Sequence, residues 1–191
     1  MSNYYLTIKT TPMKKTILYT LLFFFILTAC KKDDDTAPPI TQENTFSCKI
    51  NGELFLPEDY SSFPNTFPGI SNLIIPENNW FFHFRNRKRD IYIYIVNVLE
   101  TGSYTIQLSD GNGDFLGDEN SGCEVDLNKP NGTRHHSINN NDIVRILELD
   151  IDTRIVLEFD EITLVGNNDP NDIIKLTEGK LNINRETLNQ D

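Results

Sequence analysis

One glycine-rich stretch of the chain carries oxygen-bearing side chains at the spacing that cation binding needs. Alternate carboxylate and amide oxygens on a turning loop suit Ca²⁺, which prefers hard oxygen ligands. The match to a calcium loop is incomplete, because Phe115 and Ser121 stand where a glycine and a bidentate glutamate are expected. The stretch predicts either a weak Ca²⁺ site or a plain acidic loop, and no other cofactor is expected. The candidate ligands are Asp110, Asn112, Asp114 and Asp118.

Two of the three cysteines, Cys48 and Cys123, lie in alternating stretches that predict strands. An oxidising compartment would permit a disulfide between them, and closing so long a loop stabilises by about 4 kcal/mol in the entropic description. The alternative is two buried free thiols that pack as small apolar side chains. The separation of Cys48 and Cys123 in the sequence is compatible with a disulfide and with two free thiols.

Aromatic residues at alternate positions suggest a surface that stacks on sugars. Trp80, Tyr92 and Tyr94, with Tyr104 further along, are the candidates for such a platform. The alternative is that these rings pack in the core or pair across strands.

The histidines and carboxylates form no recognisable catalytic pattern. His83, His135 and His136 are the only histidines, and we expect them at the surface. Neighbours in a strand point to opposite faces, so His135 and His136 are not expected to share a metal. The chain contains no nucleophile elbow, zinc-protease motif or phosphate loop. No enzymatic activity is expected, and a carboxylate-dependent hydrolase is the alternative from another class.

A short basic stretch, residues 85–89 (Arg-Asn-Arg-Lys-Arg), stands out in an acidic chain. The 191 residues hold 17 basic and 28 acidic side chains, for a net charge of −11. That balance argues against nucleic acid or anionic lipid headgroups as partners, because both need clustered Lys and Arg. The basic stretch either engages an acidic partner or keeps a hairpin soluble and unpaired.

The residues after Thr45 alternate between apolar and polar, which is typical of half-buried strands. Asn51-Gly52 predicts a tight turn, and the alternating residues around the basic stretch predict a hairpin. Residues 57–78 hold four prolines and are expected to be irregular, with room for a short helix. We predict an all-β domain over residues 45–191, with eight or nine strands. Its architecture would be an antiparallel β-sandwich, immunoglobulin-like or partly closed into a barrel.

The first 29 residues read as a signal peptide. Met13-Lys14-Lys15 is a basic start, and Ile17–Leu27 is an apolar stretch of eleven residues. As a helix it would reach only about 16 Å, half of what a bilayer core requires, which indicates a signal peptide and not a spanning helix. Because the signal-peptide pattern is complete from Met13 onward, Met13 is an alternative start. Residues 1–29 hold three basic and no acidic side chains, so their removal takes the net charge from −11 to −14.

Leu27-Thr28-Ala29-Cys30 resembles the lipobox of bacterial lipoproteins. The resemblance implies cleavage before Cys30 and attachment of a membrane-anchoring lipid to its thiol. Residues 31–35 (Lys-Lys-Asp-Asp-Asp) resemble an export signal of certain Gram-negative bacteria, which implies the outer face of the outer membrane. The periplasmic leaflet is the alternative. Residues 30–44 would form the lipidated cysteine and its tether, in which Thr36 matches a sequon for O-glycosylation.

The rest of the chain resembles a group of small, uncharacterised lipoproteins of such bacteria. The similarity lies in the opening strand Phe46–Gly52, in Gly102-Ser103-Tyr104 and in the closing strands Ile155–Val165 and Gly179–Ile183. It implies a lipid-anchored, non-catalytic binding or structural module, and it transfers no activity. The expected partners are the membrane, through Cys30, and a glycan or another envelope protein.

Overall fold

The computed structural model describes residues 38–62, 64–75, 78–111, 120–127 and 132–188, which belong to one compact unit, Ala37–Asp191. Cys30, Thr36 and the lipobox lie outside the described residues. The all-β class is confirmed, because the described residues form thirteen strands and no helix, and every pairing is antiparallel. No described segment is a helix long and apolar enough to cross a membrane.

The strands differ widely in length, from three residues to thirteen. In chain order they are β1 (Thr45–Ile50), β2 (Glu53–Phe55), β3 (Tyr60–Ser62), β4 (Asn65–Phe67), β5 (Ile70–Ile75), β6 (Asn79–Arg85), β7 (Arg89–Ile95), β8 (Gly102–Thr105), β9 (Gly122–Leu127), β10 (Arg134–Ser137), β11 (Ile143–Asp150), β12 (Arg154–Gly166) and β13 (Ile173–Asn184).

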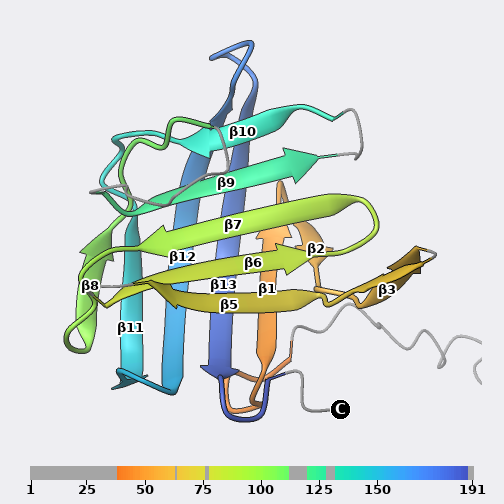
Figure 1. Ribbon diagram of the computed structural model, residues 1–191. Coiled ribbons are helices and arrows are strands. Elements are labelled where there is room, and N and C mark those ends of the chain that lie inside the picture. Colours follow the sequence, from red (N-terminus) through yellow and green to blue (C-terminus); the bar gives the residue numbers. More distant parts are fainter. Residues whose placement is uncertain (1–37, 63, 76–77, 112–119, 128–131, 189–191) are drawn as a thin grey trace, which may run out of the picture. The chain divides into compact units, whose positions relative to one another are not determined.

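Eleven strands form one sheet that curls over itself, and β3 and β4 pair separately. The main path runs β2-β1-β13-β12-β10-β9-β7-β6-β5. Figure 1 shows β5, β6, β7 and β9 crossing in front of β1, β11, β12 and β13 at a steep angle. This arrangement places the core between two layers of one sheet, as in orthogonally packed sandwiches.

The long strand β12 makes the corner between the layers. Along one edge, its residues Arg154–Phe159 pair with β11, which in turn pairs with β8. Further along the same edge, Leu164–Gly166 pair with β10, which leads to β9 and the front layer. The sheet therefore branches at β12, and thirteen residues of one strand serve both layers.

The core consists of the apolar residues that point between the layers. On β6 every second residue is buried: Trp80, Phe82 and Phe84. Phe84 stacks on Phe46 of β1 with ring centroids 3.7 Å apart, which joins the front layer to the back layer. The alternation read from the sequence thus reflects a two-layer core.

The predicted strand count of eight or nine was too low. Residues 57–78 were expected to be irregular, but they contain β3, β4 and β5. His135 and His136, expected at the surface, lie in the strand β10. β3 and β4 are short, polar and largely exposed, so their residues carry no apolar alternation that could predict a strand.

Two hairpins next to each other position the pocket described below. The β1–β2 hairpin turns at Asn51-Gly52, as predicted, with φ of 50° and 85°. Positive φ at both positions matches the right-handed twist of the strands, and Asn and Gly are the residues that adopt it at least cost. The predicted β6–β7 hairpin is also confirmed, and its turn holds residues 86–88.

The expected tether overlaps with a segment that is fixed to the domain. The amide of Asn182 donates to the Ile40 carbonyl, and the backbone N–H of Asn184 donates to the Asn44 side chain. Glu43 lies 3.9 Å from Arg154 as well. Residues 40–44 thus dock beside the end of β13.

Candidate functional site

The two hairpins enclose an open pocket, which we call the tip pocket. Its lining comes from β2, from the segment that follows β2 and from the β6–β7 turn. That segment is fastened to the turn, because the backbone N–H of Glu58 donates to the carbonyl of Arg85. The side-chain oxygen of Asn86 accepts the N–H groups of Lys88 and Arg89 and shapes the turn. The lining residues are Glu53, Leu54, Glu58, Asn86, Arg87, Lys88 and Arg89.

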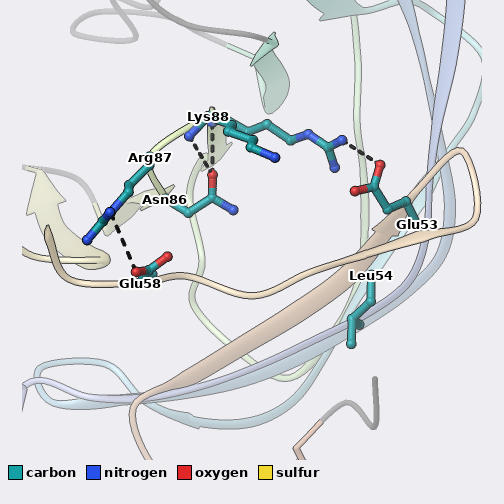
Figure 2. Close-up of a pocket in the computed structure, with 7 residues that line it drawn as sticks. Glu53, Leu54, Glu58, Asn86, Arg87 and Lys88 are labelled. Carbon is teal, nitrogen blue, oxygen red and sulfur yellow. Dashed lines mark hydrogen bonds and ion pairs between the residues drawn. The ribbon is translucent and has the colours of Figure 1, made fainter. Parts of the chain in front are cut away.

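The tip pocket has a volume of about 260 Å³, enough for a small polar group such as one sugar ring or one phosphate. Three cations and two carboxylates line it, so its formal charge is positive on a chain whose net charge is −11. Figure 2 shows Glu53 and Glu58 at opposite sides, with Asn86 between them. A positive pocket on an acidic protein concentrates field where an anion can approach.

The cations of the tip pocket are engaged to different degrees. Arg89 donates to Glu53 over 2.6 Å, and this contact lowers the pKa of the Glu53 carboxyl below its usual value of 4.5. Arg87 lies 3.7 Å from Glu58, and both side chains are more than half exposed. Lys88 forms no ion pair or side-chain hydrogen bond with any residue that the structure describes. Arg89 is thus held by Glu53 and Arg87 is loosely paired, whereas Lys88 acts on Glu53 only through a longer-range attraction.

A second set of charged residues lies on the outer face of the front layer, and we call it the outer-face cluster. It consists of Ser109, Glu124, Asp126 and Arg134. Arg134 grips Asp126 with two hydrogen bonds of 2.6 and 2.9 Å, and it lies 3.8 Å from the fully buried Glu124. The hydroxyl of Ser109 donates to the other oxygen of Glu124. Arg134 thus contacts both carboxylates of the cluster.

The strand register explains why the outer-face cluster forms. Arg134 stands opposite Asp126, and Glu124 stands opposite Tyr92, so all four residues share one face. Burial raises the pKa of Tyr92, and the neighbouring Asp126 raises it further. The pKa of Arg134 is raised by its hydrogen bonds to Asp126. Asp126 therefore favours the charged form of Arg134, and burial together with Asp126 favours the neutral form of Tyr92.

The predicted glycan platform is wrong, because two of its rings are in the interior. Trp80 lies in the core, and Tyr94, although on the other sheet face, is also fully buried. Tyr92 is half-buried and stacks on His83, with centroids 4.3 Å apart. The alternation of aromatic residues reflects packing, and Trp80 and Tyr94 are not available to stack on a sugar.

Cys48 and Cys123 are both buried and both free, which is the second of the two alternatives that the sequence left open. They belong to the core cluster between the layers. Burial raises the pKa of both thiols well above the ordinary value. Each is protonated at neutral pH and packs as a small apolar side chain.

The predicted calcium loop falls largely outside the described part of the chain. Asp110 is described, whereas Asn112, Asp114 and Asp118 are not. Among the residues that are described, no three His, Cys, Asp or Glu side chains come together in a way that could hold a metal ion.

His135 is not at the surface, contrary to expectation. It is 1% exposed, and its Nε2 lies 3.1 Å from a carboxylate oxygen of Asp172. His136 points to the opposite face, as strand geometry predicts, and its ring contacts Asn167. His83 is also largely covered and lies 3.1 Å from Asp90. The histidines serve packing and polar contacts in this fold.

The sequence pointed to the cations of the tip pocket but not to its carboxylates. Glu53 follows the Asn51-Gly52 turn directly, and Glu58 lies in the stretch expected to be irregular. The basic stretch predicts either a place for an acidic partner or a hairpin kept soluble and unpaired. The sequence does not show that the β1–β2 hairpin lies beside the basic stretch, because contacts between hairpins that are distant in the sequence leave no local pattern.

No protein-family model matches the chain, and neither the curated proteins nor the solved structures contain a significant match.

Proposed function

We propose that this protein is a lipid-anchored lipoprotein of a Gram-negative envelope, with a β-domain that acts as a non-catalytic binding or structural module. The observation that carries the proposal is the order of features around Cys30. A basic start, the apolar stretch Ile17–Leu27 and the lipobox-like Leu27-Thr28-Ala29-Cys30 precede a charged stretch. Each of these features has a role in lipoprotein processing, and two or more acyl chains anchor a protein firmly.

The distance from the lipid to the domain would be short. Residues 40–44 dock on the domain, so residues 31–39 are the part of the chain between Cys30 and the docked segment. A fully extended chain spans at most about 3.5 Å per residue, so the domain would stay within roughly 35 Å of the anchor. A module held at this distance can reach envelope glycans or neighbouring envelope proteins. The export-like signal after Cys30 favours the exterior face.

The tip pocket supports binding rather than hydrolysis. A carboxylate-dependent hydrolase needs one carboxyl with a raised pKa to act as a general acid. The pKa of Glu53 is instead lowered by Arg89, which keeps this carboxylate ionised. Glu58 lies 3.7 Å from Arg87, and both side chains are more than half exposed. The ionised Glu53 holds a cation in place and has no proton to donate.

Metabolic labelling with an alkyne analogue of palmitate tests the anchor. In a Gram-negative host, the wild-type protein should take up the label and fractionate with the outer membrane. Cys30→Ser should abolish labelling, whereas the matched change Cys48→Ala should leave it intact, because Cys48 is buried in the domain. Unlabelled wild-type protein, or labelling that persists in Cys30→Ser, would refute the proposal.

Protease treatment of intact cells tests the orientation. If the domain faces the exterior, mass spectrometry should detect cleavage in the exposed β6–β7 turn, where Arg87 and Lys88 offer trypsin sites. Complete protection in intact cells, with cleavage after the outer membrane is permeabilised, would place the domain at the periplasmic leaflet instead.

A further inference from the structure

We propose that the tip pocket is an oxyanion-binding site that takes a carboxylate or phosphate group of a small ligand or glycan residue. The inference rests on the proposed binding function and adds the chemical class of the ligand. Three observations carry it: the unengaged ammonium of Lys88, the loose pairing of Arg87 and the positive balance of an open pocket.

Lys88 provides the first observation. Most other cations that the structure describes are matched with carboxylates, as Lys49 is with Glu178 and Lys175 with Glu161. Lys88 lines the pocket and has no such partner among the described residues. An ammonium group brings three hydrogen-bond donors, which an incoming oxyanion can accept from without displacing a protein group.

Arg87 provides the second observation. Its separation of 3.7 Å from Glu58 exceeds the length of a charge-assisted hydrogen bond, and both side chains face water. Exposed pairs of this kind contribute little to stability, so Arg87 can leave Glu58 for a ligand at small cost. A guanidinium group binds carboxylate or phosphate in a bidentate manner.

Arg89 forms one wall of the tip pocket and is not available to the ligand. Its 2.6 Å contact with Glu53 fixes it at one wall, where it contributes positive potential without leaving its partner. Asn86 holds the backbone N–H groups of Lys88 and Arg89, which fixes the shape of the turn. The ligand would therefore contact mainly Lys88 and Arg87, while the turn stays preorganised.

Binding is tested by titrating the full-length protein in detergent micelles, at low salt and pH 7, and following amide shifts by NMR. Inorganic phosphate and glucuronate are the two probes. The proposal expects saturable shifts centred on residues 86–89 with at least one of them. Phosphate preference would indicate a phosphorylated ligand, and glucuronate preference an acidic sugar. The absence of saturable shifts with both probes would overturn the proposal.

Three variants separate a site from general attraction of anions. Lys88→Gln should weaken binding about fivefold, whereas Lys180→Gln should change it less than about twofold, because Lys180 is an exposed lysine on β13. Glu58→Gln should strengthen binding about threefold, because it frees Arg87 and removes a repelling charge. Equal weakening by both lysine changes, or weakening by Glu58→Gln, would contradict the site.

The result is independent of the anchor experiment. Failure of palmitate labelling would refute the lipoprotein proposal and leave the anion titration unaffected. Failure of the titration would refute the ligand class and leave the anchor standing.

Discussion

The tip pocket and the outer-face cluster use the same residue types for opposite purposes. In the outer-face cluster, Arg134 binds Asp126 with two hydrogen bonds and lies near Glu124, which is fully buried. In the tip pocket, Arg87 and Glu58 are exposed and 3.7 Å apart. Burial is the difference, because a charge removed from water must be matched within the protein. A charge left in water remains available to a ligand.

The largest expected difference between the two regions is in folding stability. Arg134→Met would remove the guanidinium that lies 3.8 Å from the buried Glu124 and binds Asp126, and we expect a loss of about 2 kcal/mol in the free energy of unfolding. Arg87→Met, the matched change in the tip pocket, should cost less than about 0.5 kcal/mol. Urea unfolding followed by the fluorescence of Trp80, the single and fully buried tryptophan, measures both.

Equal losses in the two methionine variants would break the comparison. It would mean that the outer-face cluster is no more structural than the tip pocket, or that the turn needs Arg87 to keep its shape.

A smaller effect is expected at alkaline pH, from Tyr92. Its pKa is raised in the folded protein above the ordinary value near 10, first by burial and then by Asp126. The unfolded chain therefore loses this proton at lower pH than the folded one. The stability contributed by neutral Tyr92 is present below pH 10 and is lost as pH rises through the folded pKa. Tyr92→Phe should flatten this part of the stability profile.

Arg134 lowers the pKa of Tyr92, so its removal provides a sharper version of the same test. In Arg134→Met the phenol should ionise at still higher pH, as ultraviolet absorbance reports. An unchanged ionisation midpoint would show that Tyr92 and Arg134 are not coupled.

The smallest effect belongs to Glu53 in the tip pocket. Its pKa is lowered by the hydrogen bond from Arg89, so the pair contributes stability above the unfolded pKa of 4.5 and loses it as pH falls through the folded value. NMR titration of the Glu53 carboxyl should give a pKa below 4.5 in the wild-type protein. In Arg89→Gln it should return toward 4.5, and an unaltered value would show that Arg89 does not hold this carboxylate.

The parts of the fold that depend on local chemistry could be predicted from the sequence. Asn51-Gly52 specified its turn, and alternation specified β6, β7 and the long closing strands. Alternation also assigned neighbours to opposite faces, as for His135 and His136. These features follow from backbone geometry within a few residues.

Features that depend on what covers a face could not be predicted. The pattern around Tyr94 shows that it points away from the core, but not that the outer face is covered there, so its burial was missed. The branching of the sheet at β12 has no signature, because residues 154–159 and 164–166 simply continue one strand. The tip pocket forms from segments that are distant in the sequence. The sequence therefore predicts its basic stretch but not the presence of Glu53 and Glu58 beside it.

Hydrogen–deuterium exchange of the full-length protein, with and without saturating phosphate or glucuronate, tests the central claim that ligand binds at the tip pocket while the outer-face cluster is structural. The account predicts slower amide exchange in residues 86–89 and in the segment around Glu58. Exchange in β9 and β10 should not change. Protection of β9 and β10 instead, or no protection in the tip pocket, would contradict it.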